Sequence, residues 1–450
     1  MILVNMPLAI GWLMIYQGDA IWKIFTGCAL HGLGMGLMEG PLVTYLGEIC
    51  EPSTRGVLVS LTYITGTSGM FLGLFLNTIM PWRFIAAVCL ACPIITAIAI
   101  CFIPETPQWL LFKNRTAEAE KSLRWLRGWV SSSSRSVAQE FHELQKHNEQ
   151  SKSCNTCIKR DLKCTHPLPT LSEKFAELKR KRTLKPLSIT IFMFCVSGFS
   201  GFYSMRPFIV QIFEAYESPL PPDRAAVMLS LIESLTCGLF TCLIRFTGKR
   251  RLYLVAALGA FLSAGAISCY GFIYLPSGYI SFDLTHGPFH VENTGLRYIP
   301  TICLTLSSFF SFCGIISMPW ILSSEIFPMK SRGVASGVTI ALNYSLRFIA
   351  KKSYYSMETT LSLPGISLFF CVVYGIAFVV TYFILPETEN ISLDDIERHF
   401  SDNSKKITDR KIRKSNMKTP SKDVEGSVKI TETSFENVAN NSYGINNKRY

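Results

Sequence analysis

The sequence EICEPSTRG, at residues 48–56, returns in related form as EIFPMKSRG at residues 325–333. Both copies place a glutamate seven positions before an arginine that is followed by glycine. Each copy is followed, after two long apolar segments, by the tripeptide Pro-Glu-Thr, at residues 104–106 and 386–388. Self-similarity at a fixed offset indicates an internally repeated architecture. The spacing therefore predicts two matching halves, each built from several helices.

The composition indicates that these halves lie in lipid. Of the 450 residues, 49% are hydrophobic and 17% are charged, whereas about a quarter of the residues in a typical soluble domain are charged. The apolar residues gather in runs of about twenty, the length that a helix needs to cross a bilayer. We therefore predict an all-α membrane protein with about ten spans, at residues 2–17, 21–45, 56–78, 83–103, 188–213, 224–246, 252–275, 298–322, 334–356 and 364–385.

The charges between the spans predict their orientation. The formal net charge is +12, and the basic residues are concentrated in loops 46–56, 104–187, 247–251 and 323–333 and in the C-terminal tail. Cytoplasmic loops of membrane proteins carry an excess of lysine and arginine. We therefore expect these segments in the cytosol. The same placement argues against a nucleic-acid partner, because membrane topology accounts for the basic excess.

The repeat also predicts how the chain is divided. We expect an incomplete N-terminal bundle at 1–103, a cytoplasmic linker at 104–187, a C-terminal bundle at 188–386 and a largely disordered cytoplasmic tail at 387–450. The second half contains a basic turn, GKRR, whose counterpart in the first half would lie upstream of the first residue. The pattern thus predicts a twelve-helix fold missing its first two helices, through either a truncated gene model or a short isoform.

Several motifs taken together resemble the sugar porter family of the major facilitator superfamily. They are Leu30-x-Gly32-Leu33-x-x-Gly36, Tyr45-x-x-Glu48, Arg55-Gly56, PETPQW at 104–109, Pro319-Trp320, Glu325, Arg332-Gly333, Asn343, Pro386-Glu387-Thr388 and SLDDIE at 392–397. Within the family the nearest likeness is to insect facilitated trehalose transporters, and the resemblance runs from residue 1 to about 400. It implies the major facilitator fold of two pseudo-symmetric helical bundles. It also implies a facilitative, alternating-access carrier of trehalose or hexose in the plasma membrane.

Charged residues at the cytoplasmic helix ends are candidates for gating. Charges there stay at the interface and pair, because entering hydrocarbon is costly. By resemblance, the pairs form a latch whose strength would control the conformational equilibrium of the carrier. The alternative is that they only anchor the topology. The residues concerned are Glu48, Arg55, Glu105, Glu325, Arg332 and Glu387.

Trp320 and Asn343 are the first candidates for contact with a substrate. An aromatic plane suits the C–H face of a sugar, and amides suit its hydroxyl groups, when a few such groups converge in a mostly apolar cavity. The resemblance implies these roles for both residues. Tyr344 stands where the family often has a second tryptophan. A role in packing alone is the alternative.

The chain departs from the family where the family binds its sugar. The family's glutamine pair and asparagine of the seventh helix are replaced by Ser197, Gly198 and Tyr203. Its asparagine of the eighth helix is replaced by Glu233, and the predicted spans also contain Arg206 and Arg347. Because charges inside a membrane usually pair or line water, we predict that Glu233 pairs with one of these arginines and faces the central cavity. A charged side chain that snorkels to the membrane surface, or a mispredicted helix boundary, is the alternative.

Three functions remain open. The chain could carry trehalose or a hexose, carry a different polar or charged solute on the same fold, or act as a non-transporting sensor or degenerate paralogue. The substrate-site candidates are Trp320, Asn343, Tyr344, Tyr203 and Glu233.

Enzymatic activity, a cofactor and a metal are not expected. The sequence contains neither a nucleotide-binding loop nor a nucleophile–base arrangement. Four residues of the linker could bind zinc, but their spacing is irregular. They are Cys154, Cys157, Cys164 and His166.

Overall fold

The structure is a computed structural model that describes residues 2–50, 55–128, 135–152, 178, 181–282, 295–327, 332–389, 391, 393–401 and 412. Every regular element in this part of the chain is a helix, which confirms the predicted all-α class. A helix satisfies its backbone hydrogen bonds within one segment, and an apolar run in lipid therefore folds as a helix. The linker cysteines with His166, and most of the tail, lie outside the described residues.

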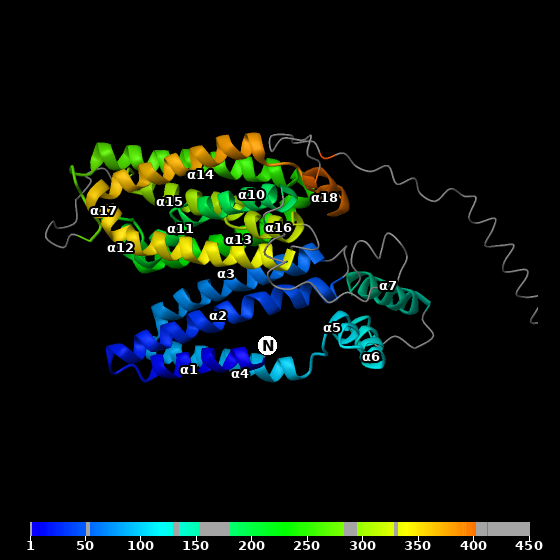
Figure 1. Ribbon diagram of the computed structural model, residues 1–450. Coiled ribbons are helices and arrows are strands. Elements are labelled where there is room, and N and C mark those ends of the chain that lie inside the picture. The colour runs from blue at the N-terminus through cyan, green and yellow to red at the C-terminus, as the bar shows by residue number, and fades with distance from the viewer. Residues whose placement is uncertain are drawn as a thin grey trace, which may run out of the picture.

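The N-terminal half contains four long helices, which form the lower group in Figure 1. They are α1 (Asn5–Tyr16), preceded by the short turn η1 (Ile2–Val4), α2 (Ile21–Ile49), α3 (Arg55–Ile79) and α4 (Trp82–Cys101). Helix α1 packs against α2 and α4. Large apolar side chains on α4 point outward, including Phe84, Ile95 and Ile98, which are 64%, 64% and 57% exposed. In water such a surface would be costly, whereas in lipid it is the expected outer face.

Three shorter helices follow the first half within residues 107–152 of the described chain. They are α5 (Pro107–Phe112), α6 (Thr116–Leu126) and α7 (Arg135–Lys152). Leu110, Leu111 and Ala119 form a small core of their own with Phe141 and Leu144. The first part of the predicted linker thus forms a helical subassembly with its own core.

The C-terminal half forms the upper group in Figure 1. Its helices are α10 (Lys181–Gly198), α11 (Phe202–Met205), η2 (Arg206–Phe208), α12 (Ile209–Ala215), α13 (Pro222–Thr247), α14 (Lys249–Tyr274), α15 (Tyr298–Phe310), the π-helical η3 (Ser311–Ile315), α16 (Met318–Glu325), α17 (Arg332–Ile384) and α18 (Leu393–Ser401). A single apolar core unites these helices, and α18 joins it through Ile396 and Phe400. Helix α18 and helices α5–α7 lie at the same end of the molecule (Figure 1).

Two predicted spans are interrupted rather than continuous. The span predicted at 188–213 breaks after α10, where Gly201 has a φ of +76° and a Cβ would lie 2.9 Å from Phe370. Only glycine adopts this backbone readily at so close an approach. The span predicted at 298–322 contains the π-helical segment η3. Broken helices are common where a transporter binds its substrate.

Six helical segments are long and apolar enough to cross a bilayer, judged by length and composition. They are Trp82–Cys101, Thr183–Ala215, Pro222–Ile244, Lys249–Tyr274, Tyr298–Ser323 and Gly333–Ile384. The last contains two helices joined at a kink at Ser362, where the sequence predicts two spans. The total of ten spans remains a prediction.

The two halves meet chiefly where α3 packs against α13. At this contact the hydroxyl groups of Ser68 and Ser234 lie 2.8 Å apart. The apolar core of the C-terminal half includes no residue of the N-terminal half among those described. The C-terminal half thus has an apolar core of its own, and α3 of the N-terminal half packs extensively along α13 beside it.

Candidate functional site

A buried ion pair lies beside the break between α10 and α11. The guanidinium of Arg206 donates to both carboxylate oxygens of Glu233, at 2.9 and 2.8 Å, and to the hydroxyl of Ser230 at 2.9 Å. The Glu233 side chain is fully buried, and that of Arg206 is 14% exposed. Of the two arginines proposed as partners for Glu233, the structure selects Arg206.

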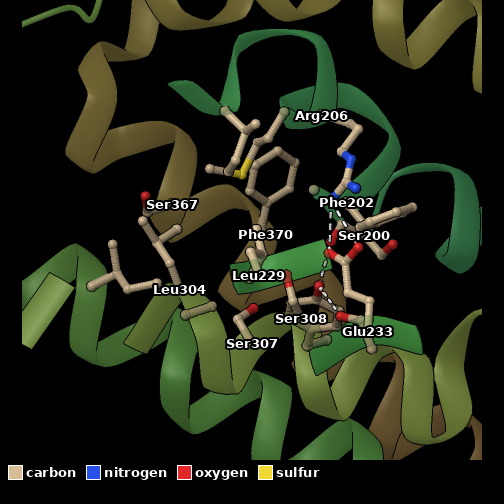
Figure 2. Close-up of a pocket in the computed structure, with 17 residues that line it drawn as sticks. Ser200, Phe202, Arg206, Leu229, Glu233, Leu304, Ser307, Ser308, Ser367 and Phe370 are labelled. Atoms are coloured by element: carbon tan, nitrogen blue, oxygen red, sulfur yellow. Dashed lines mark hydrogen bonds and ion pairs between the residues drawn. The ribbon is translucent and has the colours of Figure 1, made fainter. Parts of the chain in front are cut away.

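This ion pair borders a cavity of about 550 Å³, including the part that is open to solvent. Figure 2 shows Arg206 and Glu233 on one side of the cavity and Leu304 and Ser367 on another. Its polar lining is mainly serine hydroxyl groups, from Ser200, Ser307, Ser308, Ser311 and Ser367. All of its lining residues belong to the C-terminal half. Glu233 thus lines a cavity inside the C-terminal half, and its place at a central cavity between the halves stays a prediction.

The other four predicted substrate residues lie elsewhere, around Arg347. The guanidinium carbon of Arg347 lies 3.8 Å from the ring centroid of Tyr203, and 5.6 Å from those of Trp320 and Tyr344. Cation–π attraction stabilises such an arrangement, more strongly where water is excluded. We call Tyr203, Trp320, Tyr344 and Arg347 the aromatic–arginine cluster.

Asn343 adjoins this cluster on α17, one helical turn before Arg347 and on the same face. It is fully buried, and neither polar atom of its side-chain amide has a hydrogen-bond partner among the described residues. The Nε atom of Arg347 is buried and likewise unpartnered. Buried polar groups are nearly always hydrogen-bonded, and an unpartnered one is costly. The cluster therefore offers donors and acceptors that the described protein groups do not use.

Two residues of the N-terminal half complete the cluster. The hydroxyl of Tyr344 hydrogen-bonds to the carboxylate of Glu39, on α2, at 2.5 Å. The ring of Tyr63, on α3, lies 6.3 Å from the ring of Trp320. The aromatic–arginine cluster is thus a place where side chains of both halves meet.

A second group of charges lies at the start of α14. The ammonium of Lys249 contacts Glu325 at 2.6 Å and Glu389 at 3.0 Å. The carboxylate of Glu387 accepts the backbone N–H groups of Lys249 and Arg250, each at 3.1 Å. A carboxylate at this position satisfies two free donors and lies at the positive end of the helix.

Glycine is required in the turn beside this group. Gly248 has a φ of +83°, and a Cβ on it would lie 2.9 Å from a carboxylate oxygen of Glu387. The basic turn and the second Pro-Glu-Thr motif, which are far apart in sequence, thus come together through a backbone that only glycine accommodates well.

The predicted gating pairs are only partly visible. Glu325 is paired with Lys249, while the side chains of Arg55 and Arg332 lie outside the described part of the structure. Neither Glu48 nor Glu105 has an ion-pair partner among the described side chains. The first-half motifs are instead joined by Tyr45, whose hydroxyl donates to the carbonyl of Pro104 at 3.1 Å. The latch between the halves remains a prediction.

Three residues that contribute to these groups are not among the predicted site residues: Glu39, Tyr63 and Lys249. Glu39 had a detectable signal, because it is an acidic residue inside a predicted span, the same property that drew attention to Glu233. Lys249 belongs to a basic turn that the repeat had already marked, but its partners are more than 70 residues away in sequence. Tyr63 carries no distinguishing sequence signal in an apolar span.

Comparison with known proteins agrees with this arrangement of two helical halves. The family described as "Sugar (and other) transporter" matches residues 1–400. The facilitated trehalose transporter Tret1 of Apis mellifera ligustica is 27% identical over 397 residues, which cover 88% of this chain and 72% of that protein. The Tret1 protein of Bombyx mori is 25% identical over 403 residues, covering 89% and 73%.

Solved structures show the same fold at low sequence identity. The proton:xylose symporter XylE of the major facilitator superfamily, bound to 6-bromo-6-deoxy-D-glucose, superposes with a TM-score of 0.64 at 14% identity, covering 88% of this chain and 82% of that one. The inward-open xylose transporter XylE from E. coli gives 0.59 at 15% identity, with the same coverage. These likenesses and the family match over residues 1–400 lead to one conclusion: the chain belongs to the sugar transporter family and is a multi-pass membrane transporter with the major facilitator fold.

Proposed function

We propose that this chain is a facilitative carrier of trehalose or a hexose, which it binds at the aromatic–arginine cluster and moves by alternating access. The observation that supports this most is that Tyr344 and Trp320, from one half, meet Glu39 and Tyr63, from the other, at the cluster. A site that both halves contribute to changes its exposure when the halves rock against each other. The aromatic planes and the amide of Asn343 are the groups that a sugar needs.

The relatives support the same substrate class. The Tret1 proteins of Apis mellifera ligustica and Bombyx mori are named as facilitated trehalose transporters. We carry trehalose over to this chain as a proposal, because the identities are 27% and 25%. The departures at Ser197, Gly198 and Tyr203 leave fewer amide groups for sugar hydroxyls, and this favours a site that depends more on its aromatic rings.

We further propose that the charged motifs set the balance between the two conformations. The cluster of Lys249, Glu325, Glu387 and Glu389 ties helix ends within the C-terminal half, and such a tie lets the half move as a rigid unit. Glu48 with Arg55, and Glu105, would act in the first half, and Arg332 would add to the second. The plasma membrane, with the linker and tail in the cytosol, is the location that we expect.

Uptake of radiolabelled trehalose and glucose into oocytes tests the proposed function. We expect uptake above that of uninjected cells, and a decrease of about tenfold for Trp320→Ala and Asn343→Ala, because each removes a contact worth roughly 1–2 kcal/mol. Trp22→Ala is the matched control, since Trp22 is 60% exposed on α2. Surface biotinylation measures the amount of protein delivered.

The alternatives give different results in the same assay. Normal surface expression without uptake would favour a non-transporting sensor. Uptake that rises as the external pH falls would favour proton coupling over facilitation. Uptake that Trp320→Ala and Asn343→Ala leave unchanged would contradict the proposed site while preserving the proposed activity.

A further inference from the structure

We propose that the aromatic–arginine cluster, besides the neutral sugars of the proposed function, also binds sugars that bear a carboxylate group and binds them more tightly, with the guanidinium of Arg347 as the group that holds the carboxylate. The inference rests on the proposed function, because it takes the cluster to be the place where a sugar binds. It concerns the charge of that sugar, on which the family match says nothing.

The guanidinium of Arg347 has no carboxylate bound to it among the described residues. Among the described residues it makes no ion pair and donates no hydrogen bond, and its Nε atom is buried. Its guanidinium lies against the three aromatic rings of the cluster. An arginine inside a membrane protein is costly unless it is paired or hydrated. A carboxylate ligand would supply the missing partner through two parallel N–H···O bonds.

Arg206 shows how an arginine of the same half can be paired. Arg206 lies in the same half and also contacts an aromatic ring, at 5.4 Å from the centroid of Phe202. Yet its charge is neutralised by both oxygens of Glu233. The fold therefore can pair an arginine of this bundle completely, and it leaves Arg347 unpaired. The Glu233 carboxylate therefore compensates the charge of Arg206.

Two other charged residues, Glu39 and Lys351, lie in the electrostatic surroundings of Arg347. Glu39 is near enough to interact electrostatically with Arg347, but its carboxylate is hydrogen-bonded to Tyr344 rather than to the guanidinium. Lys351, one turn further along α17, adds a second positive charge that interacts with Arg347. The carboxylate of Glu39 is thus engaged by Tyr344, and the N–H groups of the Arg347 guanidinium stay available to a carboxylate ligand.

The guanidinium of Arg347 covers part of the aromatic surface of the cluster. A neutral sugar would stack its C–H face on a ring, but the guanidinium already covers Tyr203 at 3.8 Å. A neutral sugar that stacks on the same face of Tyr203 would displace this cation and gain no charge pairing in return. A sugar acid can keep the guanidinium in place, bind its N–H groups and present its hydroxyl groups to Asn343, one turn away. The geometry thus favours an acidic sugar over its neutral parent.

The test is equilibrium binding of radiolabelled glucuronate to the purified full chain, with unlabelled glucuronate and glucose as competitors. These two sugars differ only in the oxidation of C6, and glucose is therefore the matched neutral ligand. We expect glucuronate to compete about tenfold better than glucose, the ratio that one charge-assisted bidentate contact supplies. Salt should weaken glucuronate binding and leave glucose binding unchanged.

Variants locate the effect. Arg347→Gln should reduce the ratio of glucuronate to glucose affinity to about one, and Arg347→Lys should give an intermediate ratio, because it keeps the charge but loses the planar fork. Arg224→Gln, at an exposed position of α13, is the control for removal of a distant positive charge. Equal or tighter binding of glucose in the unmodified chain overturns the inference and leaves the sugar carrier standing. Binding of neither sugar, with the protein folded by size-exclusion chromatography, overturns the inference, and trehalose uptake in oocytes then decides the proposed function separately.

Discussion

At the scale of the residue, two arginines within one apolar bundle have different surroundings. Arg206 is bound by Glu233 and Ser230, whereas Arg347 is surrounded by the rings of Tyr203, Trp320 and Tyr344. A charge that is paired in a buried place contributes to the integrity of the fold, and removing its partner is expensive. A charge that is unpaired is available to a ligand. The same residue type can therefore have a structural role at one position and a binding role at another.

The Arg206–Glu233 pair makes a prediction about stability. Either Arg206→Gln or Glu233→Gln leaves one uncompensated buried charge, which costs about 3–5 kcal/mol. The double variant removes both charges and should recover most of that loss. Thermal unfolding of the detergent-solubilised protein measures the three changes. Glu214→Gln, at an exposed position of α12, is the matched control and should have no effect. A double variant less stable than both single variants would contradict the account.

At the scale of the element, breaks and caps decide how the helices present their side chains. The break at Gly201 places Phe202 and Arg206 beside Glu233. The carboxylate of Glu387 caps α14 from a segment more than 130 residues away. Both features depend on a glycine with positive φ at a close contact, Gly201 or Gly248. Helix ends in this half are thus positioned by backbone conformations that other residues adopt with strain.

The cap on α14 can be tested by changing one atom. Glu387→Gln keeps an acceptor for the backbone N–H groups but removes the charge at the positive helix end, and we expect a loss of about 0.5–1 kcal/mol. Glu387→Ala removes the acceptor as well, and we expect a loss of about 1–2 kcal/mol. Unfolding midpoints of the two variants should fall in that order. Glu143→Gln, on the exposed face of α7, is the control. Equal stability of all four proteins would refute the cap.

The kink in α17 gives a second prediction for an element. Ser362 has a φ of 65° and a ψ of 166°, a region occupied almost only by glycine, where another residue costs about 1–3 kcal/mol. Ser362→Gly should therefore raise the unfolding midpoint. The same substitution at Ser356, in regular helix of α17, should lower stability by about 0.5–1 kcal/mol. The pair of variants has opposite expected signs, and a decrease at both positions would show that Ser362 is not strained.

At the scale of the whole molecule, the two halves meet mainly along one pair of helices and at the aromatic–arginine cluster. The apolar core of the C-terminal half runs through to α18, while α5, α6 and α7 have their own small core. The halves touch where α3 packs on α13, at Ser68 and Ser234, and at the aromatic–arginine cluster. Limited interfaces of this kind allow one body to move against another. The arrangement suits a carrier that exposes one site to each side in turn.

Helices α5–α7 and α18 lie at the same end of the molecule (Figure 1), and we therefore expect the linker and the C-terminal tail on the same side of the membrane. Epitope tags placed between residues 128 and 135 and at the C-terminus should react with antibody only after the cells are permeabilised. A tag placed after Gly278, in the segment that follows α14, should react on intact cells, because three predicted spans separate it from each of the other two tags. Immunofluorescence with and without detergent reads all three. Tags in the linker and at the C-terminus that react from opposite sides would rule out the two-bundle arrangement.

The sequence alone determined the helical class, the two halves, the transporter family and the presence of charges that need partners. These properties follow from periodicity, apolar length and motif spacing, which are local along the chain or repeat within it. Only the tertiary structure decided that Glu233 pairs with Arg206 rather than Arg347, that Glu325 pairs with Lys249, and that Glu39 reaches Tyr344. Each of these choices depends on how helices rotate and pack against one another, and helices separated by many residues can do so in several ways that the sequence pattern does not distinguish.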